Sequence, residues 1–204
     1  MTSGRSDEEM RAVTIGEPIR HNDRIVLVQY DPKWPRQFEH EAERVREALC
    51  ERALRVEHVG STSVPGLPAK PFIDMLLQVA DSSNEPAYVP ALESAGYVLR
   101  IREPHWHEHR LFNKPGVEIK LHVFGRECLE VSRMLAFRDR LRADPADREL
   151  YARTKRALAE REWKYVQDYA DAKGHVIEAI LGRLARETPD ACQAFERRAQ
   201  RRAE

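Results

Sequence analysis

The spacing of hydrophobic side chains predicts a helix early in the chain. Phe38 begins a series of apolar residues separated by four, three and four positions, which places them on one face of a helix. Asp31 and Pro32 come just before this series and are residue types that begin helices, because aspartate accepts hydrogen bonds from free backbone N–H groups and proline lacks an N–H. We expect this helix to end near Arg52 and to pack its apolar face on a sheet.

Short runs of apolar and β-branched residues predict strands in the first two thirds of the chain. The last two runs are separated by Lys114-Pro115-Gly116, which is typical of a hairpin connection. A helical pattern covers residues 86–95. The predicted strands are residues 25–29, 54–59, 72–79, 97–102, 110–113 and 117–124.

The last third of the chain has a helical pattern throughout. The predicted helices run from Glu127 to about Arg142, from Asp144-Pro145 onward, and from about Trp163 to Glu187. Strands with interspersed helices followed by a run of helices indicate an α/β (α+β) fold with a C-terminal helical segment.

The length of 204 residues fits one domain with short ends. Residues 1–24 are polar and lack periodicity, so we expect a flexible N-terminal extension. Residues 25–187 carry the periodic patterns of the domain. Residues 188–204 alternate arginine with glutamate and alanine and predict a charged C-terminal tail.

The charge balance and the cysteines limit the possible partners. Thirty-four Lys and Arg residues balance 34 Asp and Glu residues, so a nucleic-acid partner is not expected and any anion site must be local. No run approaches the roughly 18 apolar residues of a membrane span, so membrane insertion is not expected either. The three cysteines form no close pair, which is consistent with a reducing cytoplasm and with the absence of a zinc ribbon.

A loop rich in glycine and proline between two predicted strands is the first candidate site. It begins with Gly60-Ser61-Thr62, where a glycine allows close backbone approach and the hydroxyls add donors for a phosphate. An ordinary connection is the alternative, since neither a dinucleotide-binding nor a Walker pattern is present. Lys70 ends the loop, and Asp74 interrupts the apolar strand that follows. A carboxylate at that position indicates a cation or ligand, or else a structural ion pair.

Several cations and histidines occupy positions that suggest chemistry. Lys173 lies on an apolar helical stripe and Arg138 lies between leucines, so both could point inward toward phosphate oxygens or extend along the surface to water. His122 alternates on a strong strand pattern and is a candidate ligand or acid–base group, or a structural histidine. The alternating histidines His105, His107 and His109 would share one face of a strand and bind zinc, although a solvent-exposed loop is the favoured interpretation.

Two stretches of the sequence resemble the GrpB family. They are Val28-Gln29-Tyr30-Asp31-Pro32-Lys33-Trp34-Pro35 and the long motif from Glu57 to Asp74, which contains His58-Val59-Gly60-Ser61-Thr62-Ser63-Val64-Pro65-Gly66-Leu67-Pro68-Ala69-Lys70-Pro71-Phe72-Ile73. Leu121-His122-Val123, residues 137–142, Tyr151 and Lys155 follow in the family's order, so the resemblance covers roughly residues 25–187.

The resemblance implies a nucleotidyltransferase-like mixed sheet flanked by helices. In that fold a Gly-Ser turn precedes a strand with two carboxylates, which hold a divalent metal such as Mg²⁺ on the nucleotide phosphates. Gly60-Ser61 corresponds to the turn and Asp74 to the first carboxylate and metal ligand, whereas Leu76 stands where the second carboxylate would be. Glu57, His58 or His122 could replace the missing ligand, but Lys120 occupies the first position of the family's frequent His-x-His.

These patterns lead to three hypotheses. The first is a Mg²⁺-dependent nucleotidyltransferase with a small-molecule acceptor, and the second is a binding or regulatory module that has lost catalysis, as suggested by the family's occurrence as an appendage of dephospho-coenzyme A kinase. The third is a metal hydrolase built on His105, His107 and His109. The candidate catalytic residues are Asp74, His58 and His122; the candidate phosphate-binding residues are Gly60, Ser61, Thr62, Lys70, Arg110, Arg138 and Lys173.

Overall fold

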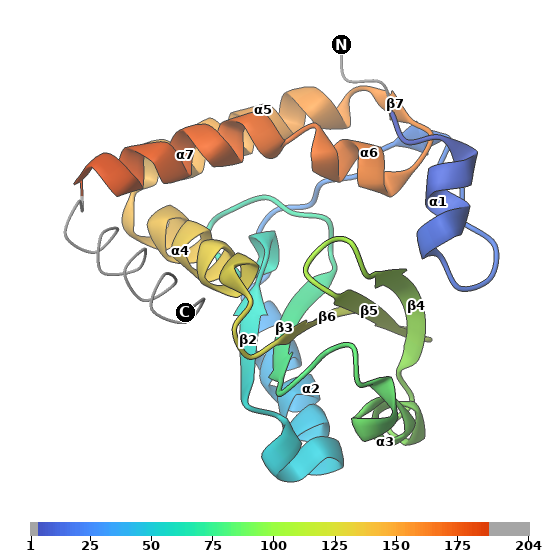
Figure 1. The fold of residues 1–204 in the computed structure, drawn as a ribbon. Coiled ribbons are helices and arrows are strands. Elements are labelled where there is room, and N and C mark those ends of the chain that lie inside the picture. Colours follow the sequence, from blue (N-terminus) through green and yellow to red (C-terminus); the bar gives the residue numbers. More distant parts are fainter. Residues whose placement is uncertain (1–3, 188–204) are drawn as a thin grey trace.

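A five-stranded sheet lies at the centre of the molecule. In the computed structural model, which describes residues 4–187, the strand order is β2-β3-β6-β5-β4 (Figure 1). The pair β3 and β6 is parallel, and the other neighbours are antiparallel. The mixed α/β fold expected from the sequence is confirmed. The strands are β2 (Arg55–Val59), β3 (Ile73–Val79), β4 (Val98–Glu103), β5 (His109–Lys114) and β6 (Val117–Gly125).

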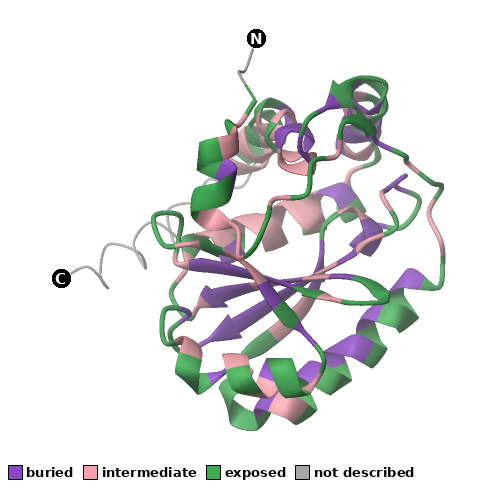
Figure 2. Cartoon of the chain, turned by 90° about the vertical axis from the view of Figure 1, so that its right-hand side faces the viewer, coloured by how far each residue is buried: buried purple, intermediate pink, exposed green. Residues whose placement is uncertain are grey.

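One face of the sheet is covered by α2 (Trp34–Leu49) and α3 (Val89–Ser94). The predicted apolar stripe of α2 faces this core, and Val45 and Leu49 have no solvent exposure. Burial of side chains of this size contributes about 2 kcal/mol each. The inner strand β3 is apolar along most of its length because both faces of the sheet are covered there, as the buried inner strands in Figure 2 show. Short 3₁₀ turns occur at Cys50–Arg52, Ser61–Ser63 and Glu85–Ala87.

The C-terminal helices form a layer over the other face. This layer contains α4 (Leu129–Ala143), α5 (Pro145–Ala159), α6 (Val166–Asp171) and α7 (Gly174–Glu187) (Figure 1). Asp144 begins α5 as predicted, because its carboxylate accepts hydrogen bonds from the backbone N–H groups of Ala146 and Asp147. We refer to α5, α6 and α7 together as the helical cap.

The single helix predicted from about Trp163 to Glu187 is wrong. Glu162–Trp163 form the short strand β7, and α6 and α7 are separate helices. Trp163 donates its indole N–H to the carbonyl of Leu158, which holds the chain in an extended turn before α6 begins. Gly174 begins α7, and the break before it places Lys173 at the junction of the two helices.

The N-terminal segment differs most from the sequence prediction. Residues 1–24 were expected to lack regular structure, whereas α1 (Asp7–Val13) begins with a capping box between Ser6 and Glu9. β1 (Asp23–Arg24) pairs with β7, and the strand predicted at residues 25–29 is reduced to a single bridge between Val28 and Ala69. Ile25 packs against Trp163 and Tyr169 of the cap, so its apolar character reflects this contact and not a strand of the main sheet.

Within residues 4–187 no helix is both long enough and apolar enough to cross a lipid bilayer. The charged tail predicted at residues 188–204 lies outside the described residues.

Candidate functional site

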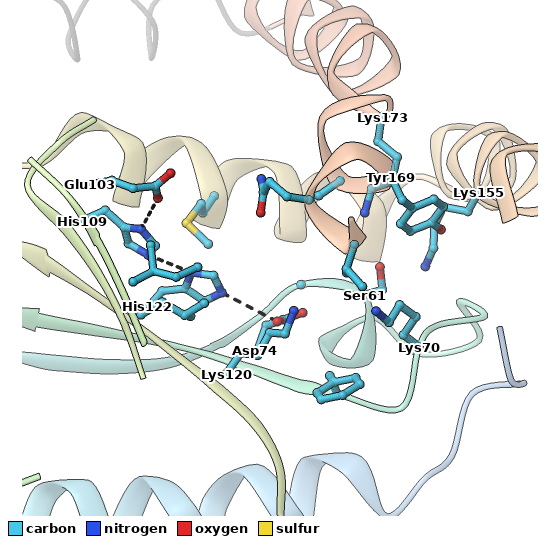
Figure 3. A pocket seen from close by; sticks show the side chains of 18 of the residues that line it. Ser61, Lys70, Asp74, Glu103, His109, Lys120, His122, Lys155, Tyr169 and Lys173 are labelled. Atoms are coloured by element: carbon cyan, nitrogen blue, oxygen red, sulfur yellow. Dashed lines mark hydrogen bonds and ion pairs between the residues drawn. The ribbon is translucent and has the colours of Figure 1, made fainter. Parts of the chain in front are cut away.

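A pocket of about 280 Å³ lies between the sheet and the helical cap. Its floor comes from β3, β6, β5 and β4, and its other walls come from the Gly60 turn, α4, α5 and α6 (Figure 3). Polar and ionisable side chains are concentrated in it. Those labelled in the figure are Ser61, Lys70, Asp74, Glu103, His109, Lys120, His122, Lys155, Tyr169 and Lys173.

The alternation of side chains along each strand explains why these residues meet. Ile73 and Met75 pack toward α2, so Asp74 between them faces the opposite side, where the cap lies. Asp74 is in register with Lys120 on the neighbouring parallel strand, and His122 lies two residues farther along β6 on the same face. Leu76 is in register with His122 and packs into a small apolar cluster beneath α4.

Gly60 makes room for the Asp74 carboxylate. Its φ of 67° lies in the left-handed region, and a Cβ at this position would approach the Cβ of Asp74 to 2.8 Å. The turn is further held by Ser63, whose hydroxyl donates to the carbonyl oxygen of Gly60 at 2.6 Å. Ser61 borders the same pocket as Asp74.

Four side chains from four adjacent strands form a continuous chain across the pocket floor. Oε2 of Glu103 lies 2.8 Å from Nδ1 of His109, and Nε2 of His109 lies 3.0 Å from Nδ1 of His122 (Figure 3). Nε2 of His122 faces Oδ1 of Asp74 at 3.7 Å. Glu103 also pairs with Arg5 from the N-terminal segment.

The hydrogen bonds of this chain fix the proton positions. Burial lowers the pKa of His109 to about 4, against the opposing effect of its bond to Glu103, so the ring is neutral at pH 7. Although burial alone would raise the pKa of Glu103, His109 and Arg5 lower it below its ordinary value, so the carboxylate only accepts. Nδ1 of His109 therefore donates to Glu103, and Nε2 of His109 accepts from Nδ1–H of His122, which leaves Nε2 of His122 on the side of Asp74.

Four lysines surround the same pocket: Lys70, Lys120, Lys155 and Lys173. Among residues 4–187, the lysines that form ion pairs are Lys114 and Lys164, so none of the four has a carboxylate partner within 4 Å. Burial, together with repulsion by neighbouring lysines, lowers the pKa of Lys70 and of Lys173 to about 8. Burial also lowers the pKa of Lys155 well below its ordinary value, while its amine donates to the carbonyl of Pro68.

The positive surroundings act on the acid as well. Burial alone would raise the pKa of Asp74, but His122, Lys120 and Lys173 hold it below the usual value for an aspartate, so the carboxylate is ionised at neutral pH. Tyr169 contributes a different feature. Its side chain is buried and its hydroxyl has no hydrogen-bond partner among the described residues.

Six of the predicted site residues meet in the pocket, and two from the Gly60 motif do not. Gly60, Ser61, Lys70, Asp74, His122 and Lys173 all border it. His58 instead faces α2, stacks on Phe38 and contacts the hydroxyl of Thr62 at 3.1 Å. Thr62 in turn donates a hydrogen bond to the carbonyl of Phe72. His58 and Thr62 therefore stabilise the loop between β2 and β3 outside the pocket. Burial lowers the pKa of His58 to about 4.

The two predicted arginines also lie outside the pocket. Arg110 follows His109 on β5, so it faces the other side of the sheet, where it pairs with Glu85 and Glu108. Arg138 projects from α4 to the outer side of β2, where it binds the Glu57 carboxylate and the carbonyl of His58. Both guanidinium groups are therefore occupied by protein carboxylates.

The three alternating histidines do not share a face. His105 and His107 lie exposed in the turn between β4 and β5, and His107 has a φ of 56°. His109 alone begins the strand and joins the hydrogen-bonded chain. Within residues 4–187 no group of three or more His, Cys, Asp and Glu side chains is placed to hold a metal ion.

The pocket residues do not fit a protein-held Mg²⁺ site. Mg²⁺ requires oxygen ligands in a regular octahedron, and Asp74 is the single carboxylate free to supply one, because Glu103 is bonded to His109 and Arg5. Leu76 provides no oxygen, and four amines surround the position. We therefore assign no chemical step to a metal ion.

Sequence reasoning missed Lys120, Lys155, Glu103 and Tyr169. For two of them the sequence spacing indicated a position near other site or core residues. Lys120 is two residues from His122 and so shares its face of the strand, and Lys155 is four residues from Tyr151 on the buried stripe of α5. No such indication exists for Glu103 and Tyr169, because β4 and α6 reach the pocket through tertiary packing alone.

Comparisons with known proteins cover the whole pocket. The sequence model described as GrpB protein matches residues 24–183. The UPF0157 protein BH1888 of Halalkalibacterium halodurans is 57% identical over 179 residues, which are 88% of this chain and 92% of that protein. The crystal structure of the conserved protein GrpB from Enterococcus faecalis has a TM-score of 0.67 at 31% identity and covers 79% of this chain and 98% of its own. A dephospho-CoA kinase of Mycolicibacterium paratuberculosis is 31% identical over 175 residues, which are 73% of this chain and 43% of that protein.

Proposed function

The chain belongs to the GrpB family, and we propose that its pocket binds a nucleotide or a similar phosphate-bearing small molecule and transfers a nucleotidyl group to the hydroxyl of a small acceptor. The observation that carries this proposal is the presence, in one pocket, of four lysines without carboxylate partners and of the hydrogen-bonded chain from Glu103 to His122, which faces Asp74. The lysines supply the attraction for phosphate oxygens, and the chain supplies a proton acceptor.

Phosphate recognition rests on charge and on position. Lys70 and Lys120 both approach the Phe72 ring, with each Nζ 5.3 Å from its centroid, while Lys173 approaches from the cap. Ammonium groups form short, charge-assisted hydrogen bonds to phosphate oxygens, which are stronger when water is partly excluded. Ser61 and the left-handed Gly60 turn add hydroxyl and backbone donors on the same side.

The chemistry follows from the proton positions. An acceptor hydroxyl between His122 and Asp74 would give its proton to Nε2 of His122, while its oxygen forms a bond to the α-phosphorus of the nucleotide. The bond from that phosphorus to the leaving diphosphate then breaks with its electron pair. The ionised Asp74 stabilises the imidazolium that results, and His109 keeps the ring in the required tautomer.

A binding or regulatory module without turnover is the second candidate function. Leu76 favours it, because the pocket lacks the second carboxylate that two-metal transfer would use. The match to part of a dephospho-CoA kinase is also consistent with a domain that accompanies an enzyme.

Calorimetric titration with ATP, GTP, CTP and UTP, each with and without Mg²⁺, tests ligand binding first. We expect binding by the wild type and weaker binding by Lys173→Met, with the exposed Lys33→Met as the matched control. Failure of all four nucleotides under both conditions would refute the proposal.

Transfer is then tested with α-labelled nucleotides in the presence of a low-molecular-mass cell extract. A labelled product that disappears in both Asp74→Asn and His122→Gln supports the transferase. Nucleotide binding without any labelled product favours the binding module.

A further inference from the structure

The lysines of the pocket outnumber the anions that the protein itself provides. Within the pocket, Lys70, Lys120 and Lys173 stand against the carboxylate of Asp74, which also faces His122, while Glu103 is held by His109 and Arg5. Uncompensated positive charge in a half-buried site is costly, so the ionised state of these amines is stabilised when an anion enters.

The amines come from different walls of the pocket and converge. Lys70 ends the loop before β3, Lys120 lies in the floor, Lys155 projects from α5, and Lys173 lies between α6 and α7. Nζ of Lys70 and Nζ of Lys120 each lie 5.3 Å from the centroid of the same Phe72 ring, and the charge of Lys120 contributes to the lowered pKa of Lys70 and of Lys173. An anion with several charged oxygens bridges such groups better than one with a single charge.

Two further observations limit the ligand. The volume of about 280 Å³ is at the lower end for small-molecule sites, which suits a short chain of phosphates better than a whole cofactor. Tyr169 lines this volume, and its buried hydroxyl has no hydrogen-bond partner in the described part of the chain, so we treat this hydroxyl as a donor for a ligand oxygen.

The same lysines surround the position beside Asp74 at which a divalent cation would bind. Lys120 is the register partner of Asp74 across the parallel pair of strands, so its side chain lies on the same face of the sheet as the Asp74 carboxylate. A divalent cation there would be repelled by three neighbouring ammonium groups and would find one protein oxygen ligand.

We infer that the pocket binds two or more linked phosphate groups through its lysine amines and the Tyr169 hydroxyl, and that this binding requires no divalent cation. The inference rests on the proposed function, because it specifies the ligand class of the same pocket. It adds that the protein's own cations do the charge neutralisation that a metal ion would do elsewhere.

The test is isothermal titration of the full chain with inorganic diphosphate, inorganic phosphate and ATP, in EDTA and separately in MgCl₂. We expect diphosphate and ATP to bind in EDTA, and diphosphate to bind at least about tenfold more tightly than phosphate. Lys120→Met and Lys173→Met should each weaken diphosphate binding about tenfold, and Tyr169→Phe should weaken it by a smaller factor. Lys33→Met is the control for loss of one charge, and thermal unfolding checks that each variant is folded.

The outcomes separate this inference from the proposed function. Binding that occurs only in MgCl₂ would overturn the inference and leave the proposed nucleotide site intact. Equal affinity for phosphate and diphosphate would overturn the assignment of linked phosphates. Absence of binding in both solutions would overturn the inference and the proposed function together.

Discussion

The carboxylate of Asp74 fills the space in which a side chain at residue 60 would lie. A glycine is required there for two separate reasons, the positive φ and the close approach. The chain offers a way to separate them. Gly66 has a similar φ of 78° but no atom within 4 Å of the position of a Cβ.

We expect Gly60→Ala to weaken ATP binding more than tenfold and to destabilise the fold by about 3 kcal/mol, through backbone strain and the clash with Asp74. Gly66→Ala should reduce the stability of the fold by about 1 kcal/mol through backbone strain alone and leave ATP binding unchanged. Thermal unfolding and calorimetry measure the two effects. Equal losses in the two variants would mean that contact with Asp74 is unimportant.

The proton positions of His109 and His122 give a second prediction at this scale. Long-range ¹⁵N–¹H correlation spectra of protein labelled at histidine should show the hydrogen of neutral His109 on Nδ1, because that atom faces the Glu103 carboxylate. Glu103→Gln should increase the Nε2–H tautomer of His109, whereas substitution of the exposed His105 should change nothing. A wild-type His109 with its hydrogen on Nε2 would contradict the proposed chain.

Side-chain direction limited what could be predicted of the site. Asp74 and Lys173 stood out because a charged group interrupted an apolar pattern, and the structure brings them together. His58 and Arg110 stood out for their position beside a turn or strand start. Each of them faces the wrong side of the sheet, and a single sequence does not reveal which face of a strand meets the cap.

At the scale of elements, α4 holds the Gly60 turn from outside the pocket. Arg142 donates from Nε and Nη2 to the carbonyl of Ser63 at 3.0 and 2.9 Å, and Arg138 donates to the carbonyl of His58. Arg138, which the sequence suggested as a phosphate ligand, thus helps Arg142 to fix the backbone that borders the pocket.

We expect Arg142→Met to increase amide hydrogen exchange of residues 60–64 about tenfold, because the turn loses a charge-assisted bond. Arg148→Met is the matched control, since Arg148 binds carbonyls at the end of α4 instead. Unchanged exchange in Arg142→Met would show that the turn is held by its own internal bonds.

Helices and strands could be predicted where hydrophobic residues recur at regular spacing. The stripe of α2 and the run of β3 depend on local spacing that persists in the fold. The short strand β7 before α6 was not predictable, because Trp163 acts through contacts with α5 and β1 that no local pattern contains.

At the scale of the whole molecule, α4, α5 and α7 are joined by an ionic cluster around the buried Asp147. Asp147 of α5 accepts hydrogen bonds from Arg140 of α4 at 2.6 Å and from Nε of Arg183 of α7 at 3.0 Å. Burial would raise the pKa of Asp147, but the two guanidinium groups outweigh it and lower the pKa below its usual value.

Asp147→Asn should reduce the free energy of unfolding by about 3 kcal/mol at pH 7, because two arginines lose a buried partner. Since the pKa of Asp147 is lower in the folded state, its contribution is present above the ordinary carboxyl range and is lost as pH falls through the folded value. Urea unfolding at several pH values should therefore give equal differences at pH 7 and pH 5 and a smaller one below about pH 4. A difference that stays constant at acidic pH would argue against the ionic cluster.

The contact between α1 and the cap has a consequence for the order in which the molecule is made. Asp7 pairs with Lys164, and the backbone N–H of Arg5 donates to Asp168. Arg5 and Asp7 leave the ribosome long before Lys164 and Asp168 are synthesised. The contacts of the N-terminal segment with these residues therefore form only late in synthesis. Asp74 likewise leaves the ribosome well before Lys173, and the pocket acquires its ligand-binding wall only when synthesis of the domain is nearly complete.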